Sequence, residues 1–170
     1  TSVQQLPGIL TEVSNEYRVL AFNGVSYIHY DNVYFDTDQL KFYFDHHNER
    51  AVRQKVRIRK YSETNACFFE LKLKDNKGRT NKLRLNASDI KEILSDAEKD
   101  LLYSSIPKLD GKPVYPQLYN QFNRITLVNF EGGERATIDT NISFKFNGII
   151  KEFPDLVIIE IKQDFLARGI

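Results

Sequence analysis

The sequence has little of several features that define whole classes of protein. Its single cysteine, Cys67, has no partner in the chain for an internal disulfide, and its apolar neighbours indicate a small buried hydrophobe. No stretch reaches the ~18 consecutive apolar residues of a transmembrane helix, and the first residues show no signal-peptide pattern. These absences predict a cytoplasmic, reducing setting and no contact of this domain with a membrane.

The chain also lacks an excess of charge of either sign. Its 24 Lys and Arg residues against 23 Asp and Glu give a formal net charge of +1, so we predict that nucleic acid is not a partner. At 170 residues it is long enough for one domain with a substantial core. Methionine is absent even from the first position, so we expect the sequence to belong to a longer chain.

What the sequence does contain is a local concentration of basic residues between Gln54 and Leu85. In three successive segments, charged residues alternate with apolar ones. Side chains two apart on a strand point to the same face, so each segment has one charged and one apolar face. The charged faces carry Lys55, Arg57 and Arg59, then Glu70, Lys72 and Lys74, and finally Lys82 and Arg84.

Neighbouring strands with almost one sign of charge need a compensating anion, because like charges on paired strands repel each other. An ordinary antiparallel sheet with its charged face in water is the simpler alternative, and it would account for any single segment. For the three together we favour a polyanion site. Phosphate is the leading candidate ligand, because arginine guanidinium groups match its oxygens with paired hydrogen bonds.

The remaining sequence predicts further strands and a few helices. Helices are expected over 6–19, 37–48 and 88–104, with Thr37 and Ser88 as the N-caps of the last two. Alternating residues predict strands over 25–35, 120–130, 134–146 and 155–162, and the two prolines within 108–119 indicate a connector. The fold class is therefore α+β, with about seven antiparallel strands. An open sheet would leave the polar faces in solvent, whereas a closed barrel would make them a charged tunnel.

The order of the motifs resembles that of the VTC-type polyphosphate polymerase domain. The motifs are VYFDTDQL, HHNERAVRQKVRIRKY, FFELKLK, KLRL, NRITL, RATIDT and VIIEIK, and they span nearly the whole sequence. That family belongs to the triphosphate tunnel metalloenzyme, or CYTH-like, superfamily. The resemblance implies an antiparallel β-barrel tunnel with a few covering helices. It also implies that residues 1–170 form one tunnel domain without the superfamily's first strand and without the helix that usually follows the last strand.

The resemblance implies a reaction as well. The γ-phosphoryl group of ATP would be transferred to a polyphosphate chain, with Mn²⁺ or Mg²⁺ held by Glu160 and by the phosphates. By motif, the catalytic residues would be Arg57, Arg59, Lys72, Arg124, Arg135 and Glu160. The further phosphate-binding residues would be Lys74, Lys82, Arg84 and Lys162, with Arg84 a better match to the K-x-R strand than Lys82.

Several alternatives stay open. The same tunnel could hydrolyse tripolyphosphate or nucleoside triphosphates, or it could bind polyphosphate or inositol phosphates without turnover. Nucleic acid is a more distant alternative, because its backbone is also a polyanion. Glu160 could form a salt bridge with Lys162 or a neighbouring basic strand instead of holding a metal. We interpret Asp139 as structural, with metal binding as its alternative, and His46 and His47 as surface or tunnel-rim residues.

Overall fold

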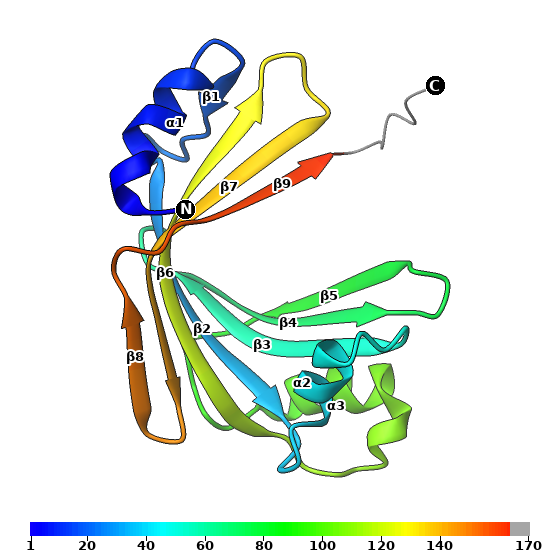
Figure 1. The fold of residues 1–170 in the computed structure, drawn as a ribbon. Coiled ribbons are helices and arrows are strands. Elements are labelled where there is room, and N and C mark those ends of the chain that lie inside the picture. The colour runs from blue at the N-terminus through cyan, green and yellow to red at the C-terminus, as the bar shows by residue number, and fades with distance from the viewer. Residues whose placement is uncertain (164–170) are drawn as a thin grey trace. The chain divides into compact units, whose positions relative to one another are not determined.

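The structure is a computed structural model, and it describes residues 1–163. Its helices are α1 (Leu6–Glu12), α2 (Lys41–His47) and α3 (Asp96–Ser105), with short 3-10 turns at Val3–Gln5 and Pro107–Leu109. Its strands are β1 (Tyr17–Val19), β2 (Tyr27–Asp36), β3 (Arg53–Tyr61), β4 (Ala66–Lys74), β5 (Thr80–Asn86), β6 (Tyr115–Asn129), β7 (Glu134–Phe146), β8 (Ile149–Phe153) and β9 (Ile158–Gln163) (Figure 1). The predicted α+β class is confirmed.

The strands of the described residues form a mostly antiparallel sheet that is not closed. Its hydrogen-bonded order is β5-β4-β3-β2-β6-β7-β8, with β1 paired to β6 and β9 paired to β7. A closed barrel would require the outer edge of β5 to pair with another strand. No such pairing occurs within residues 1–163, so the barrel expected from the sequence is not observed.

The chain divides into two compact units. Among the described residues, one consists of Thr1–Tyr30, Gln121–Phe144 and 150–163, and we call it the α1 unit after its helix. The other consists of Asp31–Asn120 and Lys145–Ile149, and we call it the α3 unit. Both β2 and β6 contribute residues to each unit.

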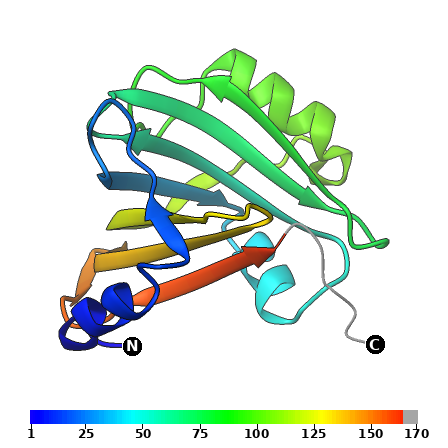
Figure 2. The same ribbon diagram turned by 90° about the horizontal axis from the view of Figure 1, so that it is seen from above.

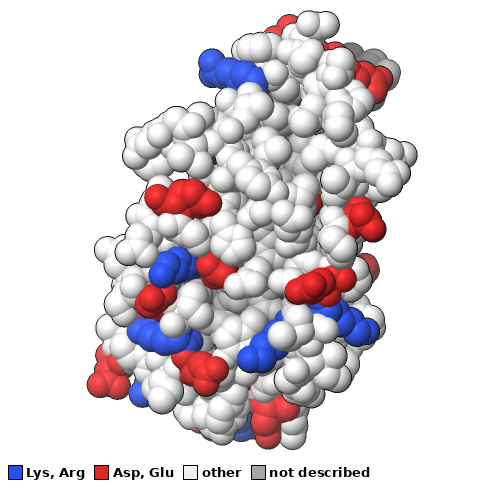
Figure 3. All heavy atoms as spheres, turned by 90° about the vertical axis from the view of Figure 1, so that its left-hand side faces the viewer, with Lys and Arg blue, Asp and Glu red and all other residues white. Residues whose placement is uncertain are grey.

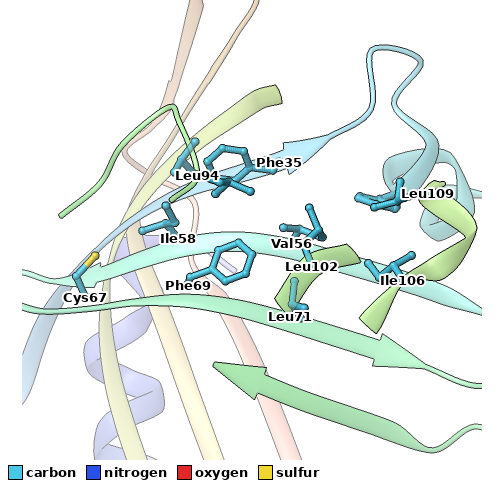
Figure 4. Close-up of a cluster of buried hydrophobic side chains, with 12 residues drawn as sticks. Phe35, Val56, Ile58, Cys67, Phe69, Leu71, Leu94, Leu102, Ile106 and Leu109 are labelled. Atoms are coloured by element: carbon cyan, nitrogen blue, oxygen red, sulfur yellow. The ribbon is translucent and has the colours of Figure 1, made fainter. Parts of the chain in front are cut away.

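The core of the α3 unit lies on the apolar face of β2, β3 and β4 (Figure 4). The alternation read from the sequence places these strand residues together: Val33, Phe35, Val56, Ile58, Cys67, Phe69 and Leu71. Leu102 of α3 is fully buried against them, and α3 lies along this side of the strands (Figure 2). The interpretation of Cys67 as a small buried hydrophobe is confirmed.

Helix α3 begins later than the sequence pattern predicted. Its N-cap is Ser95 rather than Ser88, and a capping box forms in which Ser95 accepts from Glu98 N and Glu98 accepts from Ser95 N. The Ser95-x-x-Glu98 spacing is the sequence signature of this box. Glu98 is 2% exposed and forms an ion pair with Lys91 at 2.8 Å. Lys91, which precedes the helix, therefore also orients the Glu98 carboxylate of the capping box.

Helix α2 is shorter than the predicted 37–48 helix, and its N-cap residue is Leu40 rather than the predicted Thr37. The Thr37 hydroxyl accepts from Lys41 N at 3.1 Å, and the Asp36 carboxylate accepts from Phe42 N and Tyr43 N, both at 2.8 Å. Burial raises the pKa of Asp36, although these backbone hydrogen bonds oppose the shift. Two side chains therefore satisfy the helix N-terminus, where backbone donors have no partner within the helix.

The α1 unit has its own small core. Leu127 of β6, Ala136 and Ile138 of β7, and Val157 are buried, and Leu6 and Leu10 of α1 pack against them. The helix predicted over 6–19 ends at Glu12, because the chain then turns and Tyr17–Val19 pairs with β6 as β1.

The sequence patterns missed two strands and predicted too late a start for a third. β1 and β8 lie outside the predicted strands, and β6 starts at Tyr115, within the segment interpreted as a connector. The nine strands of the described residues therefore exceed the seven expected.

No helix in the described part of the chain has both the length and the apolar character needed to cross a bilayer.

Candidate functional site

The three basic segments are neighbouring strands of the α3 unit, with β3 paired to β4 and β4 paired to β5. Their charged side chains lie opposite the core, on what we call the charged face. The antiparallel register arranges this face in rows that cross all three strands. The rows are Arg53–Lys74–Thr80, Lys55–Lys72–Lys82 (the lysine row), Arg57–Glu70–Arg84 (the arginine row) and Arg59–Phe68–Asn86.

The arginine row is neutralised in part by its own central residue. Arg57 contacts Glu70 Oε2 through Nε at 2.7 Å and Nη2 at 2.6 Å, and its Nη1 donates to the Tyr34 hydroxyl at 3.2 Å. Burial alone would raise the pKa of Tyr34, but the charge and hydrogen bond of Arg57 lower it from its ordinary value. The Arg57 guanidinium is therefore held in one orientation by two partners.

Arg59 is more deeply buried than Arg57. Its side chain is 9% exposed and its Nε donates to the Asn32 side-chain oxygen at 2.7 Å. Burial and the nearby charge of Arg57 lower its pKa. Asn32 and Tyr34 both come from β2, two residues apart, so that strand supplies the groups that orient both arginines.

The lysine row differs because none of its three members is acidic. Lys55 lies opposite Lys72, and Lys72 lies opposite Lys82, and all three side chains are exposed. Directly opposed like charges destabilise a pair of strands. This row is therefore the part of the charged face where an anionic ligand would relieve the most repulsion.

The other predicted residues of β4 and β5 have distinct surroundings. The Arg84 guanidinium lies over the Phe68 ring at 4.3 Å, a cation–π contact that holds an otherwise exposed side chain. Lys74 is half-buried in the row that flanks the lysine row, opposite Arg53.

The surface in Figure 3 contrasts with the charged face, because Lys and Arg side chains there are interspersed with Asp and Glu.

In the α1 unit, Arg124 is already engaged. It forms two hydrogen bonds with Asp139, from Nε at 2.6 Å and from Nη2 at 2.7 Å, and its guanidinium lies over the rings of Tyr30 and Phe122. Burial would lower its pKa, but the hydrogen bonds and charge of Asp139 raise it. Asp139 is thus a structural partner of Arg124, which is how the sequence was interpreted.

The remaining predicted residues meet where β7 pairs with β9. Arg135 lies opposite Lys162, and Thr137 lies opposite Glu160, with all four side chains on one face. Glu160 contacts Lys162 at 3.4 Å, and both side chains are more than half exposed, which makes this a weak ion pair. The salt-bridge alternative for Glu160 is therefore present, in a form that a competing cation would displace easily.

Glu160 is the metal ligand predicted from the sequence. Within residues 1–163, no three His, Cys, Asp or Glu side chains come close enough to share a metal ion. Mg²⁺ in nucleotide sites typically takes one or two carboxylates and completes its shell with phosphate oxygens and water. The exposed carboxylate of Glu160 can supply such a ligand.

The predicted residues thus form two groups, one in each unit. Arg57, Arg59, Lys72, Lys74, Lys82 and Arg84 belong to the α3 unit, and Arg124, Arg135, Glu160 and Lys162 belong to the α1 unit. Sequence reasoning missed Asn32 and Tyr34 as partners of the arginines. Their alternation with Val33 and Phe35 was the available signal, since it places them opposite the core.

Fold and surface together define an α+β domain with a cationic face built from three strands. The chain belongs to the VTC domain family, whose model matches residues 1–166. No curated protein matches it.

Solved structures give more distant matches. A candidate adenylate cyclase from Vibrio parahaemolyticus is 14% identical with a TM-score of 0.48, over 81% of this chain and 63% of that one. A protein from Pyrococcus horikoshii is 11% identical with a TM-score of 0.49, over 97% and 76%. A candidate adenylyl cyclase from Hippeastrum, described as having a dominant triphosphatase activity, is 14% identical with a TM-score of 0.48, over 97% and 76%. The chain thus spans less than two thirds of the first of these proteins.

Proposed function

We propose that this domain binds chains of linked phosphates and transfers the γ-phosphoryl group of ATP to a polyphosphate chain. The observation that carries phosphate binding is the lysine row, three cations in register across β3, β4 and β5. Membership of the VTC family supports polyphosphate as the ligand. Phosphoryl transfer requires positioning and charge compensation more than covalent participation by the protein.

The residues of the charged face divide these tasks between them. Lys72 and Lys82 are exposed and bind phosphate oxygens as mobile point charges. Arg57 and Arg59 are oriented by Glu70, Tyr34 and Asn32, so they lose less side-chain freedom when they bind a phosphate. Lys74 and Arg84 extend the cationic surface on either side.

The α1 unit has a group of charged residues of its own, which includes the proposed metal ligand. Glu160 would hold Mn²⁺ or Mg²⁺, and Arg135 and Lys162 in the adjacent row would bind phosphate oxygens. A metal held there would supply positive charge to neutralise and orient the phosphates. Arg124 mainly orients Asp139 through their two hydrogen bonds. It would bind a phosphate oxygen while it remains paired with Asp139.

The test is incubation of the protein with ATP and Mn²⁺, followed by separate measurement of polyphosphate and of free phosphate. Long chains support the proposal. Free phosphate alone would show a hydrolase, and tight binding of tripolyphosphate without turnover would show a binding module. Binding of duplex or single-stranded nucleic acid that tripolyphosphate fails to displace would overturn a phosphate-chain site altogether.

The role of Glu160 is tested by Glu160→Gln, with Glu152→Gln on the exposed strand β8 as the matched control. Glu160→Gln should abolish turnover and weaken Mn²⁺ binding, measured by electron paramagnetic resonance, while tripolyphosphate still binds. Turnover retained at the level of the control would remove Glu160 from the metal site.

A further inference from the structure

The proposed function leaves unused the pair His46-His47 at the end of α2. Helix α2 packs against β3, and the cations that act on His46 are Lys55 and Arg53 of β3 and Lys72 of β4. Lys55 and Lys72 are members of the lysine row, and Arg53 belongs to the row beside it. The half-buried His46 therefore belongs to a helix that packs against the strand of Lys55 and Arg53, and its imidazole lies within electrostatic reach of the lysine row.

The electrostatic surroundings keep this imidazole neutral. Burial, followed by the charges of Lys55, Arg53 and Lys72, lowers the pKa of His46 to about 4, and the negative charge of Asp45 on its own helix opposes this shift. Asp45 is also engaged, because it pairs with Lys41 at 2.5 Å. His47 is different, since it is exposed and its ring stacks on Tyr43 at 5.9 Å.

The ligand that best matches the lysine row is one with a high local charge. An internal phosphate of a linked chain carries one negative charge, whereas a terminal phosphate group carries up to two, its second pKa being about 6. Three opposed lysines are relieved most by the group with the greater charge. The same negative charge, next to His46, would cancel the influence of the cations that keep the imidazole neutral.

We propose that the lysine row and His46 form the subsite for the terminal phosphate group of the phosphate chain, and that His46 takes up a proton as this group binds. The proton comes from solvent and is bound by a ring nitrogen lone pair. No bond to phosphorus forms or breaks, and the imidazolium then donates a hydrogen bond to a phosphate oxygen. The inference rests on the proposed function, because it assigns one end of that ligand to one part of the charged face.

Proton uptake of this kind makes affinity depend on pH. In the absence of ligand the pKa of His46 is about 4, and the adjacent phosphate raises it. Between the lower and the higher value, the complex holds a proton that the ligand-free protein lacks. Affinity therefore falls as pH rises through this window, by up to about tenfold per pH unit.

The experiment is calorimetric titration with tripolyphosphate at pH 5 to 6 in buffers of different ionisation enthalpy, which counts the protons taken up. The protein and the control His47→Asn should take up more protons than His46→Asn, by a fraction that approaches one per site. Cyclic trimetaphosphate, which has no terminal group, should bind with the same proton uptake in all three proteins.

A second measurement needs no variant. The imidazole resonances of the unaltered protein, followed by NMR over pH, should show the pKa of His46 rising when tripolyphosphate is added and that of His47 nearly unchanged. Equal proton uptake with and without His46, or a His46 pKa that tripolyphosphate leaves unchanged, would overturn this inference while phosphate binding stands. Failure of tripolyphosphate to bind at all would instead overturn the proposed function with it.

Discussion

The arginine row and the lysine row lie one step apart on the same three strands, yet their charges are balanced differently. In the arginine row, Glu70 lies between Arg57 and Arg84 and forms an ion pair with Arg57. In the lysine row the corresponding central position is occupied by Lys72, so every neighbour across the strands repels. A single residue in the middle strand thus separates a row that stabilises the sheet from a row suited to an external anion.

This difference changes which residues matter most for the ligand. The sequence motif draws attention to Arg57 and Arg59, but in the folded sheet both have protein partners before any ligand arrives. Lys72 and Lys82 on the same face are more exposed to solvent than either arginine. We therefore expect the lysines to contribute more to the binding of phosphate, and the arginines to combine binding with stability of the sheet.

The largest effect should come from removing the centre of the lysine row. We expect Lys72→Gln to weaken tripolyphosphate binding by ~10–100-fold, since a hydrogen bond to a charged group contributes about 1.5–3 kcal/mol. The melting temperature should stay the same or rise, because a repulsive neighbour is lost. Calorimetric titration at low salt and thermal unfolding followed by circular dichroism measure the two effects.

The matched control for this prediction is Lys77→Gln, which removes the same charge in the turn between β4 and β5. It should leave the affinity within about twofold, because an exposed charge away from the site is screened by salt. Equal losses in both variants would show that only net charge matters and that the row has no special role.

Breaking the arginine row should have the opposite pair of effects. Glu70→Gln leaves Arg57 with a weaker, neutral partner, so we expect the free energy of unfolding to fall by about 1–2 kcal/mol. Phosphate binding should become tighter, since Arg57 and Arg84 lose a competing anion. Urea unfolding gives the first quantity, and Asp75→Asn, at the exposed Asp75–Arg79 pair, should cost less than Glu70→Gln because solvent screens an exposed pair. A weaker affinity for tripolyphosphate in Glu70→Gln would contradict this account.

A smaller effect concerns stability and pH. The pKa of His46 is about 4 in the folded protein and has its ordinary value in the unfolded chain, which therefore binds more protons between pH 4 and about 6.5. The free energy of unfolding is therefore highest above that window, where the imidazole is neutral in both states. It decreases as pH falls through the window, because the unfolded chain takes up the proton first. Urea unfolding at several pH values should show a flatter profile for His46→Asn than for His47→Asn; identical profiles would contradict it.

The smallest effect sharpens the comparison between the rows. Lys55→Gln in the lysine row should raise the pKa of His46, because one of the charges that lower it is removed. Arg84→Gln in the arginine row should leave it nearly unchanged, because Arg84 lies on β5, whereas the cations with the largest effect on His46 are Lys55, Arg53 and Lys72 on β3 and β4. NMR titration of the imidazole distinguishes the two; equal shifts would mean that His46 senses the whole face rather than its nearest rows.

Much of the fold followed from local patterns. The strand predicted over 134–146 coincides with β7, and the apolar residues of β3 and β4 are the buried ones, because alternation along a strand directly reflects which face is buried. Errors arose where several signals competed. Ser88 and Ser95 both precede a helical pattern, and the reciprocal hydrogen bonds with Glu98 select Ser95. β8 was missed because all five of its residues are exposed and its sequence lacks a buried face.

The division of charged and apolar residues between the two faces of β3, β4 and β5 could be read from the chain alone, because a period of two is a property of each strand taken separately. The pairing of Lys72 with Lys55 and Lys82, and of Glu70 with Arg57 and Arg84, could not. Register depends on how neighbouring strands pack their apolar sides and on the turns that join them, and a shift by two residues would keep every face while rearranging every row. The neighbours that balance or concentrate charge therefore emerge only when the strands come together.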